Sequence, residues 1–297
     1  MRSLPFLVCL SVLPASRSTG QRSLKVGGQP RHYRLHVPES YDGTKRVALI
    51  LVLHGRGSSS LYASAHYGFS ALAEKQGFLV AYPDALGDPA EWQPADPARE
   101  KGMRDVRFLG ALIDQLKKSY RIHPRRVYAC GHSYGGIMSH SLAAHLSQKI
   151  AAIGVVAGSL GFRGGKKPRV PPKPRQAVSL IAFHARDDPK VPFASGGSRF
   201  VSAPESIAFW VTHNRCRKKP EAAELDGGSV IRKTYPDGWD GTEVVFYDMK
   251  TGGHAWPDSD DGPLDATALI WKFFREHPKD APRPKVPASR RAPKKKG

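Results

Sequence analysis

The feature that most constrains this chain is the segment GHSYG at residues 131–135, which fits the pattern G-x-S-x-G. It lies between a short apolar run at residues 126–129 and a helical pattern that continues to about residue 146. A sharp turn between a buried strand and a helix lifts a serine hydroxyl above the edge of a sheet, and glycines on both sides give the crowded backbone the room that it needs. The pentapeptide often arises by chance, but in this setting it predicts that Ser133 is a nucleophile.

The rest of the chain alternates short apolar runs with amphipathic helical patterns. Strands are expected at about residues 33–37, 47–53, 78–82, 126–129, 151–156, 179–184 and 242–247, and helices at about residues 62–75, 105–120, 136–146, 204–213 and 264–277. Continuous apolar runs are typical of buried parallel strands, and their alternation with helices indicates βαβ units. The strand at 33–37 alternates instead, as an antiparallel edge strand does. We therefore expect one α/β domain over residues 30–277, with a mostly parallel central sheet and helices on both faces.

Both ends of the chain differ in composition from the middle. Residues 4–15 are largely apolar, follow Arg2 and precede small and polar residues, which is the order of parts in a secretory signal peptide. The run is too short to span a bilayer, which takes about 20 residues. We expect residues 1–20 to be a cleaved signal peptide and the protein to be secreted, to the periplasm or outside the cell; a frayed first strand or a mis-assigned start codon is the alternative. Residues 278–297 are basic and rich in proline, and we expect them to form a disordered tail.

The formal net charge of +20 raises the question of a polyanionic partner. Much of this charge lies in two proline-rich segments, residues 163–175 and 276–297, where basic residues outnumber acidic ones. Neither segment interleaves aromatic and basic side chains as surfaces that bind nucleic acids do. We therefore expect no specific nucleic-acid partner, and only weak electrostatic contact between the basic tail and an anionic surface.

A serine hydroxyl needs a general base and an acid that orients this base, in the chain order Ser, Asp, His. His254 follows the strand expected at 242–247, in a loop whose glycines would let the imidazole reach over the sheet edge. It is the expected base, and a purely structural loop histidine is the alternative. The acid is expected in the segment HARDDPKVPF at residues 184–193, where Asp187 and Asp188 compete. An Asp before proline favours a turn, and spacing does not decide between the two.

An oxyanion hole needs two backbone amides, one from the residue after the nucleophile and one from the loop after an early buried strand. Tyr134 is the expected source of the first amide, and Arg56, in the segment LHGRG, of the second. The Arg56 guanidinium is also a candidate clamp for an anionic group of the substrate, since arginine binds carboxylates well. His54 is expected to brace this loop rather than to react.

No metal site and no cofactor are expected. The histidines lack the spacing of metal ligands, and there is no paired-cysteine motif. Only Cys130 and Cys216 follow the expected signal peptide, so the fold cannot be built on disulfides. We expect both cysteines to be unpaired.

Taken together, these segments resemble a known family. The matching segments are LILVLHGRG, RVYACGHSYGG, HARDDPKVPF, TGGHAWP and, near the end, ALIWKFFREH. They are similar to the extracellular polyhydroxybutyrate depolymerase and feruloyl esterase branch of the α/β-hydrolases, over about residues 33–277. The resemblance implies the α/β-hydrolase fold and a catalytic triad of Ser133, Asp188 and His254, which decides against Asp187. It implies a serine carboxylic-ester hydrolase that works through an acyl-enzyme on polyesters, on feruloyl or acetyl esters of carbohydrates, or on related small esters.

The resemblance also implies that the long loop carrying Trp92 lines the substrate pocket. Trp256, two residues after His254, is the second candidate substrate contact, and plain packing is the alternative for both rings. The segment 163–175 is longer than the family pattern and is a candidate edge of the cleft. Two other functions stay open: a catalytically idle hydrolase-fold protein held on a surface by its basic tail, and a serine peptidase of the same fold.

Overall fold

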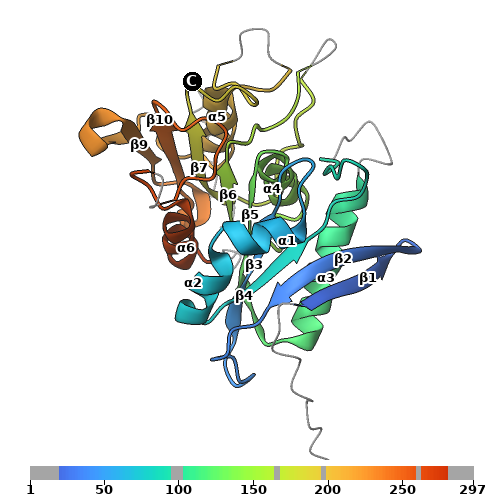
Figure 1. The fold of residues 1–297 in the computed structure, drawn as a ribbon. Coiled ribbons are helices and arrows are strands. Elements are labelled where there is room, and N and C mark those ends of the chain that lie inside the picture. The colour runs from blue at the N-terminus through green and yellow to red at the C-terminus, as the bar shows by residue number, and fades with distance from the viewer. Residues whose placement is uncertain (1–19, 95–102, 164–167, 195–198, 259–261, 280–297) are drawn as a thin grey trace, which may run out of the picture.

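The computed structural model describes residues 20–94, 103–163, 168–194, 199–258 and 262–279. These residues form one ten-stranded sheet in the order β1-β2-β4-β3-β5-β6-β7-β10-β9-β8 (Figure 1). The strands are β1 (Gly20–Val26), β2 (Gln29–His36), β3 (Val47–Leu53), β4 (Leu79–Pro83), β5 (Ile122–His132), β6 (Ala152–Val156), β7 (Ser179–Ala185), β8 (Glu221–Leu225), β9 (Val230–Tyr235) and β10 (Val244–Met249). The helices are α1 (Ser60–His66), α2 (Phe69–Gln76), α3 (Arg104–Ser119), α4 (Tyr134–His145), α5 (Ala203–His213) and α6 (Ala266–Glu276), with short 3-10 helices η2 (Asp226–Gly228) and η3 (Trp239–Gly241).

The central strands β4, β3, β5, β6, β7 and β10 run parallel to one another. They correspond to the continuous apolar runs of the sequence, because a parallel strand that is covered on both faces has no polar side to show. Antiparallel strands complete both sides of the sheet, with β2 and β1 beside β4 and with β9 and β8 beside β10. The predicted α/β fold with a mostly parallel sheet is confirmed.

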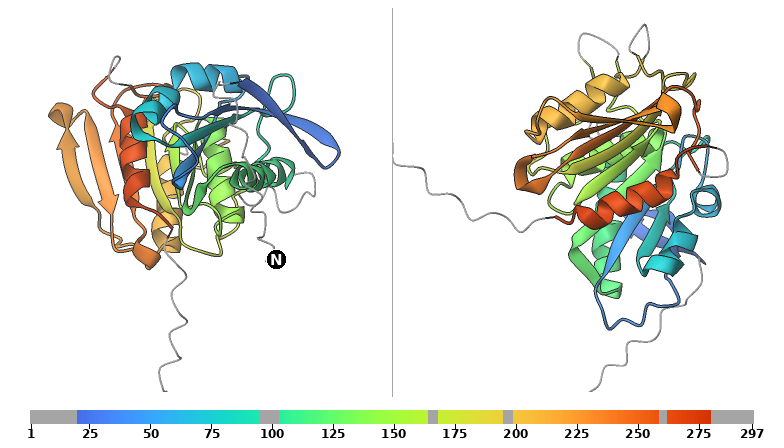
Figure 2. Two further views of the ribbon diagram at one scale, coloured as in Figure 1. Left: turned by 90° about the horizontal axis from the view of Figure 1, so that it is seen from below. Right: turned by 90° about the vertical axis from the view of Figure 1, so that its left-hand side faces the viewer.

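Helices cover both faces of this sheet (Figure 2). On one face α3, α4 and α5 contribute Phe108, Met138 and Trp210 to a continuous hydrophobic core. On the other face α1, α2 and α6 contribute a second core that includes Phe69 and Phe274. Because two packed layers hold the sheet, the carboxyl ends of its strands form a rigid platform for the loops that follow them.

The N-terminal side of the sheet differs from the expectation. β1 begins at Gly20 and pairs along its whole length with β2. The domain start predicted at residue 30 is therefore too late, and the outermost strand is β1 rather than the one predicted over residues 33–37. β1 alternates half-buried and exposed side chains, a weak signal in the polar segment GQRSLKV. Residues 1–19, which hold nearly all of the predicted signal peptide, lie outside the described residues.

Two local predictions need correction. The single helix predicted over residues 62–75 is α1 and α2, separated where Gly68 takes a φ of 69°, a left-handed value that glycine adopts at little cost. The hairpin of β8 and β9 was not predicted. Its side chains are mostly exposed or half-buried, so the segment EAAEL carries little of the apolar pattern that marks a strand.

The C-terminal end of the described chain is tied to the body. The backbone N–H of Lys279 donates to the Arg125 carbonyl at 2.8 Å, and the Lys279 carbonyl accepts from Arg125 Nε at 2.6 Å. The tail predicted from residue 278 therefore begins no earlier than residue 280, and residues 280–297 lie outside the described residues. No described helix is long and apolar enough to cross a membrane.

Candidate active site

Ser133 lies on the sharp turn between β5 and α4, at the carboxyl end of a central strand. Its backbone has φ 55° and ψ −119°, a combination that residues with a side chain rarely adopt. The Ser133 N–H donates to the Val156 carbonyl at 2.9 Å, which ties the turn to the end of β6. The neighbouring strand thus helps to hold the strained conformation.

The two glycines of the motif are required for reasons of space. A Cβ added at Gly135 would lie 2.2 Å from the Leu53 carbonyl oxygen. A Cβ added at Gly131 would lie 2.5 Å from the Gly135 carbonyl carbon. Both distances are far below a normal contact, so the backbones of β3, β5 and α4 meet here without room for a methyl group.

His254 and Asp188 meet across two loops, one after β10 and one after β7. His254 Nδ1 lies 2.7 Å from Asp188 Oδ2, and the Asp188 side chain is fully buried. The other carboxylate oxygen, Oδ1, accepts from the backbone N–H groups of Lys190 at 2.8 Å and Val191 at 2.9 Å. Burial opposes ionisation of Asp188, but the hydrogen bonds from His254 and the two amides outweigh it and hold the pKa of the carboxyl below its usual value.

Asp187, the competing acid, contacts the same histidine loop in another way. Its exposed carboxylate accepts from the backbone N–H of Gly253 at 2.8 Å. The two adjacent acids therefore divide the contact: Asp188 bonds to the imidazole of His254, and Asp187 bonds to the backbone beside it.

Two histidines brace this arrangement, His184 buried and His132 half-buried, and sequence reasoning assigned neither of them a role. His132 Nε2 lies 3.1 Å from the His254 carbonyl oxygen, to which it donates, and their rings are 4.7 Å apart. Burial and, secondarily, the nearby His254 lower the pKa of His132 to about 4, so it is neutral at neutral pH. His184 Nε2 donates to the Val191 carbonyl at 2.7 Å and so closes the acid loop.

One pocket of about 600 Å³ is lined by Ser133 and His254 together. Arg56 and Tyr134, whose amides are the expected oxyanion donors, line it as well. Its other walls include Tyr62, Tyr67, Lys190, Val191, Arg199 and Phe200. The structure thus gathers residues from four separate loops and from α1 around the serine.

The loop that carries Arg56 is braced as predicted. His54 is fully buried, donates from Nδ1 to the Gly55 carbonyl at 2.7 Å and accepts at Nε2 from the Ala85 N–H at 3.0 Å. Trp92 is also fully buried, and its Nε1 donates to the His54 carbonyl at 2.8 Å. The prediction that Trp92 contacts substrate is therefore wrong, because its ring packs in the core behind this loop.

Trp256 also serves packing rather than the pocket surface. Its ring stacks on Tyr67 with centroids 4.4 Å apart, and its Nε1 donates to Thr267 Oγ1 at 3.0 Å. Tyr67 lines the pocket, whereas Trp256 lies behind it. The predicted substrate contact at Trp256 is corrected to a support for the aromatic side chain that does face the pocket.

The guanidinium of Arg56 does not stand ready for a substrate anion. Its Nε lies 2.6 Å from Glu91 Oε2, so the charge is paired within the protein. Two other cations line the pocket. Lys190 belongs to the acid segment 184–193 but was given no role from the sequence, and Arg199 lies outside every segment that the sequence singled out.

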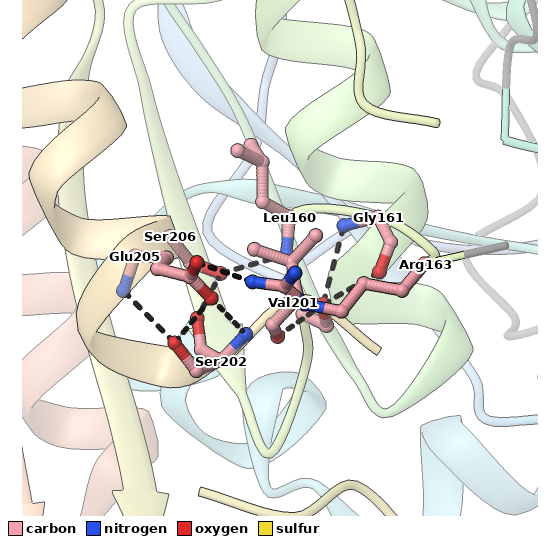
Figure 3. A network of polar contacts seen from close by, with 8 residues as sticks. Leu160, Gly161, Arg163, Val201, Ser202, Glu205 and Ser206 are labelled. Atoms are coloured by element: carbon pink, nitrogen blue, oxygen red, sulfur yellow. Dashed lines mark hydrogen bonds and ion pairs between the residues drawn. The ribbon is translucent and has the colours of Figure 1, made fainter. Parts of the chain in front are cut away.

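The basic segment 163–175 does not edge this pocket in its described part, which contradicts the prediction. Arg163, Pro168, Val170 and Lys173 line a different hollow beside α5. Arg163 is instead part of a polar network that joins the chain after β6 to the start of α5 (Figure 3). The bonds of this network are Val201 N–H to the Gly161 carbonyl at 3.0 Å, Leu160 N–H to Ser206 Oγ at 3.0 Å, and the reciprocal capping contacts of Ser202 and Glu205.

The described residues contain no group of three or more His, Cys, Asp or Glu side chains that could hold a metal ion. Cys130 and Cys216 are both buried and free. Burial raises the pKa of the Cys216 thiol to about 11, so this thiol stays protonated at neutral pH.

Comparison with known proteins places these features in a wider group. Residues 50–290 match the family described as "Alpha/beta hydrolase family". Feruloyl esterase C of Emericella nidulans is 29% identical to this chain over 255 residues, which covers 82% of this chain and 83% of that protein.

Solved structures share the fold at lower identity. The acetyl xylan esterase from Aspergillus awamori has a TM-score of 0.63 at 13% identity, covering 86% of this chain and 99% of that chain. A ferulic acid esterase from Anaeromyces mucronatus, solved in complex with ferulic acid, has a TM-score of 0.56 at 15% identity, covering 88% of this chain and 90% of that one.

The sequence resembled both polyhydroxybutyrate depolymerases and feruloyl esterases. The names of these relatives support the resemblance to feruloyl esterases and do not support the one to the depolymerases. A family match over most of the chain and relatives that are esterases lead to one conclusion: the chain belongs to the alpha/beta hydrolase family and is an esterase.

Proposed function

We propose that the chain hydrolyses carboxylic esters with Ser133 as the nucleophile, His254 as the general base and Asp188 as the acid that orients the base. The observation that carries this proposal is the 2.7 Å bond between His254 Nδ1 and Asp188 Oδ2, made by an imidazole that lines the same pocket as Ser133. A carboxylate at Nδ1 keeps the proton on that nitrogen and leaves Nε2 free to accept the serine proton.

In the first half of the reaction, Ser133 Oγ attacks the ester carbonyl carbon while its proton passes to His254 Nε2. The tetrahedral oxyanion accepts hydrogen bonds from the backbone amides of Arg56 and Tyr134. Tyr134 is the first residue of α4, where amides lack an acceptor within the helix and the positive end of the helix dipole adds to their field. The carbon–oxygen bond to the alcohol then breaks, and the alcohol leaves with the proton from His254.

In the second half, water attacks the acyl group on Ser133 and gives a proton to His254. The second oxyanion rests on the same amides and collapses to the free acid as Ser133 regains its proton. The lowered pKa of Asp188 keeps this carboxylate ionised at neutral pH, where it stabilises the imidazolium that forms in each half-reaction. The cycle uses no group beyond these side chains, two amides and water.

The substrates we propose are feruloyl or acetyl esters of a carbohydrate. The relatives with feruloyl and acetyl xylan esterase names support this class. Tyr62 and Tyr67 on the pocket wall also support it, since an aromatic ring packs against either a phenolic ring or a sugar face. Tyr62 is 48% exposed and can offer one ring face to a substrate group.

Labelling with a fluorophosphonate tests the nucleophile. Wild type is expected to be labelled and Ser133→Ala is not, while Ser23→Ala, which removes an exposed hydroxyl on β1, is labelled as wild type is. If the folded wild-type protein takes no label, the proposal fails and the chain is a catalytically idle member of its fold.

A substrate panel tests the reaction class. We expect turnover of 4-nitrophenyl acetate and methyl ferulate, with slower turnover of 4-nitrophenyl butyrate and none of a peptide panel. If peptides are the only compounds turned over, the chain is a peptidase and the proposed ester chemistry is wrong.

We also propose that the protein is exported, on the basis of the order of charged, apolar and small residues in the first 20 positions. N-terminal sequencing of the protein recovered outside the cytoplasm is expected to give a start near residue 20. Protein found only in the cytoplasm and beginning at Met1 would contradict this. Cleavage just before Gly20 would retain every strand that the structure describes.

A further inference from the structure

The pocket contains cations for which the proposed mechanism has no use. Lys190 and Arg199 both line it beside Ser133 and His254. Among the residues that the structure describes, no carboxylate lies within ion-pair distance of either side chain, whereas Arg56 is paired with Glu91. Both residues are exposed, so water solvates their charges, and both cationic groups are open to a ligand of opposite charge.

Lys190 is placed by the acid loop itself. Its backbone N–H donates to Asp188 Oδ1 at 2.8 Å, so the residue has a fixed position relative to the triad acid. Its side chain is exposed and forms part of the same wall as His254. The ammonium is therefore available to a substrate group at the rim of the pocket.

Arg199 is held more tightly. Its guanidinium donates to the Tyr134 hydroxyl at 2.9 Å and lies over the Phe200 ring, 4.9 Å from the centroid. The Arg199 carbonyl accepts from the backbone N–H of Arg163, a member of the polar network that joins the chain after β6 to α5. Only one of the five N–H donors of the guanidinium is used on Tyr134 in this contact, so the group is oriented while donors remain for a ligand.

The acids near the pocket are already engaged. The described contacts are Glu91 with Arg56 at 2.6 Å, Asp188 with His254 at 2.7 Å, and Asp187 with the Gly253 N–H at 2.8 Å. None of them forms an ion pair with Lys190 or Arg199. The carboxylates of Asp187 and Asp188 remain nearby, so the pocket offers a ligand two cationic groups on its lining rather than a region of net positive charge.

We propose that the ester cleaved at this site carries a carboxylate away from its scissile bond, and that Lys190 and Arg199 bind this carboxylate. The inference rests on the proposed ester hydrolysis. It specifies the substrates as acidic esters: acyl esters on the hydroxyl of an acidic sugar or, beyond the feruloyl and acetyl esters proposed above, monoesters of dicarboxylic acids. Arginine presents a planar pair of donors to a carboxylate, and lysine adds a mobile point charge.

Matched ester pairs test this directly. For a carboxylate on the acyl side, 4-nitrophenyl hydrogen adipate is compared with 4-nitrophenyl methyl adipate. For one on the alcohol side, 4-(acetoxymethyl)benzoate is compared with its methyl ester. In each pair the scissile bond is the same and only a remote charge differs. We expect kcat/KM for the acid to exceed that for the neutral ester by about tenfold in one of the pairs, the size of one charge-assisted hydrogen bond in a partly exposed site.

Substitutions then assign the preference to the two residues. In Lys190→Met and in Arg199→Gln the ratio of acid to neutral kcat/KM is expected to fall several-fold, mainly through KM of the acid, and to approach one in the double variant. Arg199→Lys keeps the charge and is expected to retain part of the preference. Lys218→Met is the matched control, because Lys218 is exposed and does not line the pocket; it removes the same unit of net charge and is expected to leave the ratio unchanged.

The outcomes separate this inference from the function on which it rests. Turnover of the neutral esters without preference for the acid in either pair overturns the inference and leaves the esterase mechanism standing. An equal fall in the ratio for Lys218→Met also overturns it, because the preference then comes from the overall charge. If no ester is turned over and no fluorophosphonate label is taken up, it is the proposed mechanism that has failed.

Discussion

Ser133 and His254 reach the same pocket by different physical means. The serine turn is a place where backbones from β3, β5 and α4 meet so closely that a Cβ at Gly135 would lie 2.2 Å from a carbonyl oxygen. The base and the acid instead lie on loops joined by hydrogen bonds between polar groups, with Asp188 on the imidazole of His254 and Asp187 on the backbone beside it. The serine region is constrained by shape, and the acid–base region by charge and hydrogen bonding.

This difference implies that the two regions fail in different ways. A substitution that adds volume in the serine region should lower the free energy of unfolding, because the rigid sheet leaves no path for relaxation. A substitution in the acid–base region that keeps volume but changes charge should lower kcat while the fold persists.

The largest expected effect belongs to Asp188→Asn, which keeps the shape of the side chain and removes its charge. An amide can donate to His254 Nδ1 and so favour the tautomer that cannot take the serine proton, and kcat for 4-nitrophenyl acetate is expected to fall by about 10⁴-fold. Steady-state kinetics beside urea unfolding measures the loss and shows whether the fold persists. Asp187→Asn is the matched control, since its side-chain oxygen can still accept from Gly253, and it is expected to stay within about threefold of wild type. Equal losses in the two variants would contradict the assignment of Asp188 as the orienting acid.

Gly135→Ala should give the largest loss of stability. The added methyl group meets the backbone of Leu53 rather than a flexible side chain, so we expect the free energy of unfolding to fall by at least about 4 kcal/mol, or soluble protein to be lost. Urea unfolding or thermal melting measures it.

Gly110→Ala provides the comparison for this change. Gly110 is a buried glycine within α3, where a Cβ would make an ordinary contact of 3.5 Å with Leu146 Cδ1. Alanine also favours a helix over glycine, so this variant is expected to be as stable as wild type or up to about 1 kcal/mol more stable. A Gly135→Ala variant as stable as Gly110→Ala would show that the serine region is not limited by space.

The contrast between the regions also explains what could be predicted from the sequence. Close packing restricts the residue types that a position accepts, so the glycines around Ser133 and the apolar run of β3 could be interpreted from the sequence alone. For the loops around His254, sequence spacing could not decide which aspartate is the triad acid, because Asp187 and Asp188 are adjacent. Only the three-dimensional structure shows that Asp188 bonds to the imidazole and Asp187 to the backbone.

Roles that depend on what covers a side chain were not predictable. Trp92 and Trp256 lie near the motifs, yet a large ring can pack in a core or face a ligand, and nothing in its neighbours along the chain decides which. Lys190 and Arg199 were missed for the same reason, since a single cation in a basic chain carries no local signal. The weak polar–apolar alternation of β1 likewise did not predict a strand, because this segment is held as a strand by its pairing with β2.

The smallest expected effect is a difference in how the two regions respond to acid. The pKa of His132 is lowered from 6.5 to about 4 by burial and then by the nearby His254. The unfolded chain therefore binds a proton at this histidine between about pH 6.5 and pH 4 while the folded chain does not, so the free energy of unfolding falls as the pH is lowered, by roughly 3 kcal/mol from this group. The pKa of Asp188 is lowered from 3.8, and by the same rule its contribution is present above pH 3.8 and is lost only below that value.

The two pH windows do not overlap, so the contributions of His132 and Asp188 to the free energy of unfolding can be measured separately. Free energies of unfolding from urea titrations at pH 7, 5.5, 4 and 3 are expected to show a shallower loss between pH 6.5 and pH 4 in a His132→Asn variant than in wild type. His140, buried in α4 with its pKa lowered to about 3 by burial, is expected to account for a further share of that loss. The Asp188→Asn variant is expected to run parallel to wild type but lower above pH 4, and to approach wild type below pH 4, where the wild-type carboxylate becomes protonated and its contribution is lost. Identical curves for wild type and His132→Asn between pH 6.5 and pH 4 would mean that the serine region gains nothing from keeping this histidine neutral, and that its stability comes from backbone packing alone.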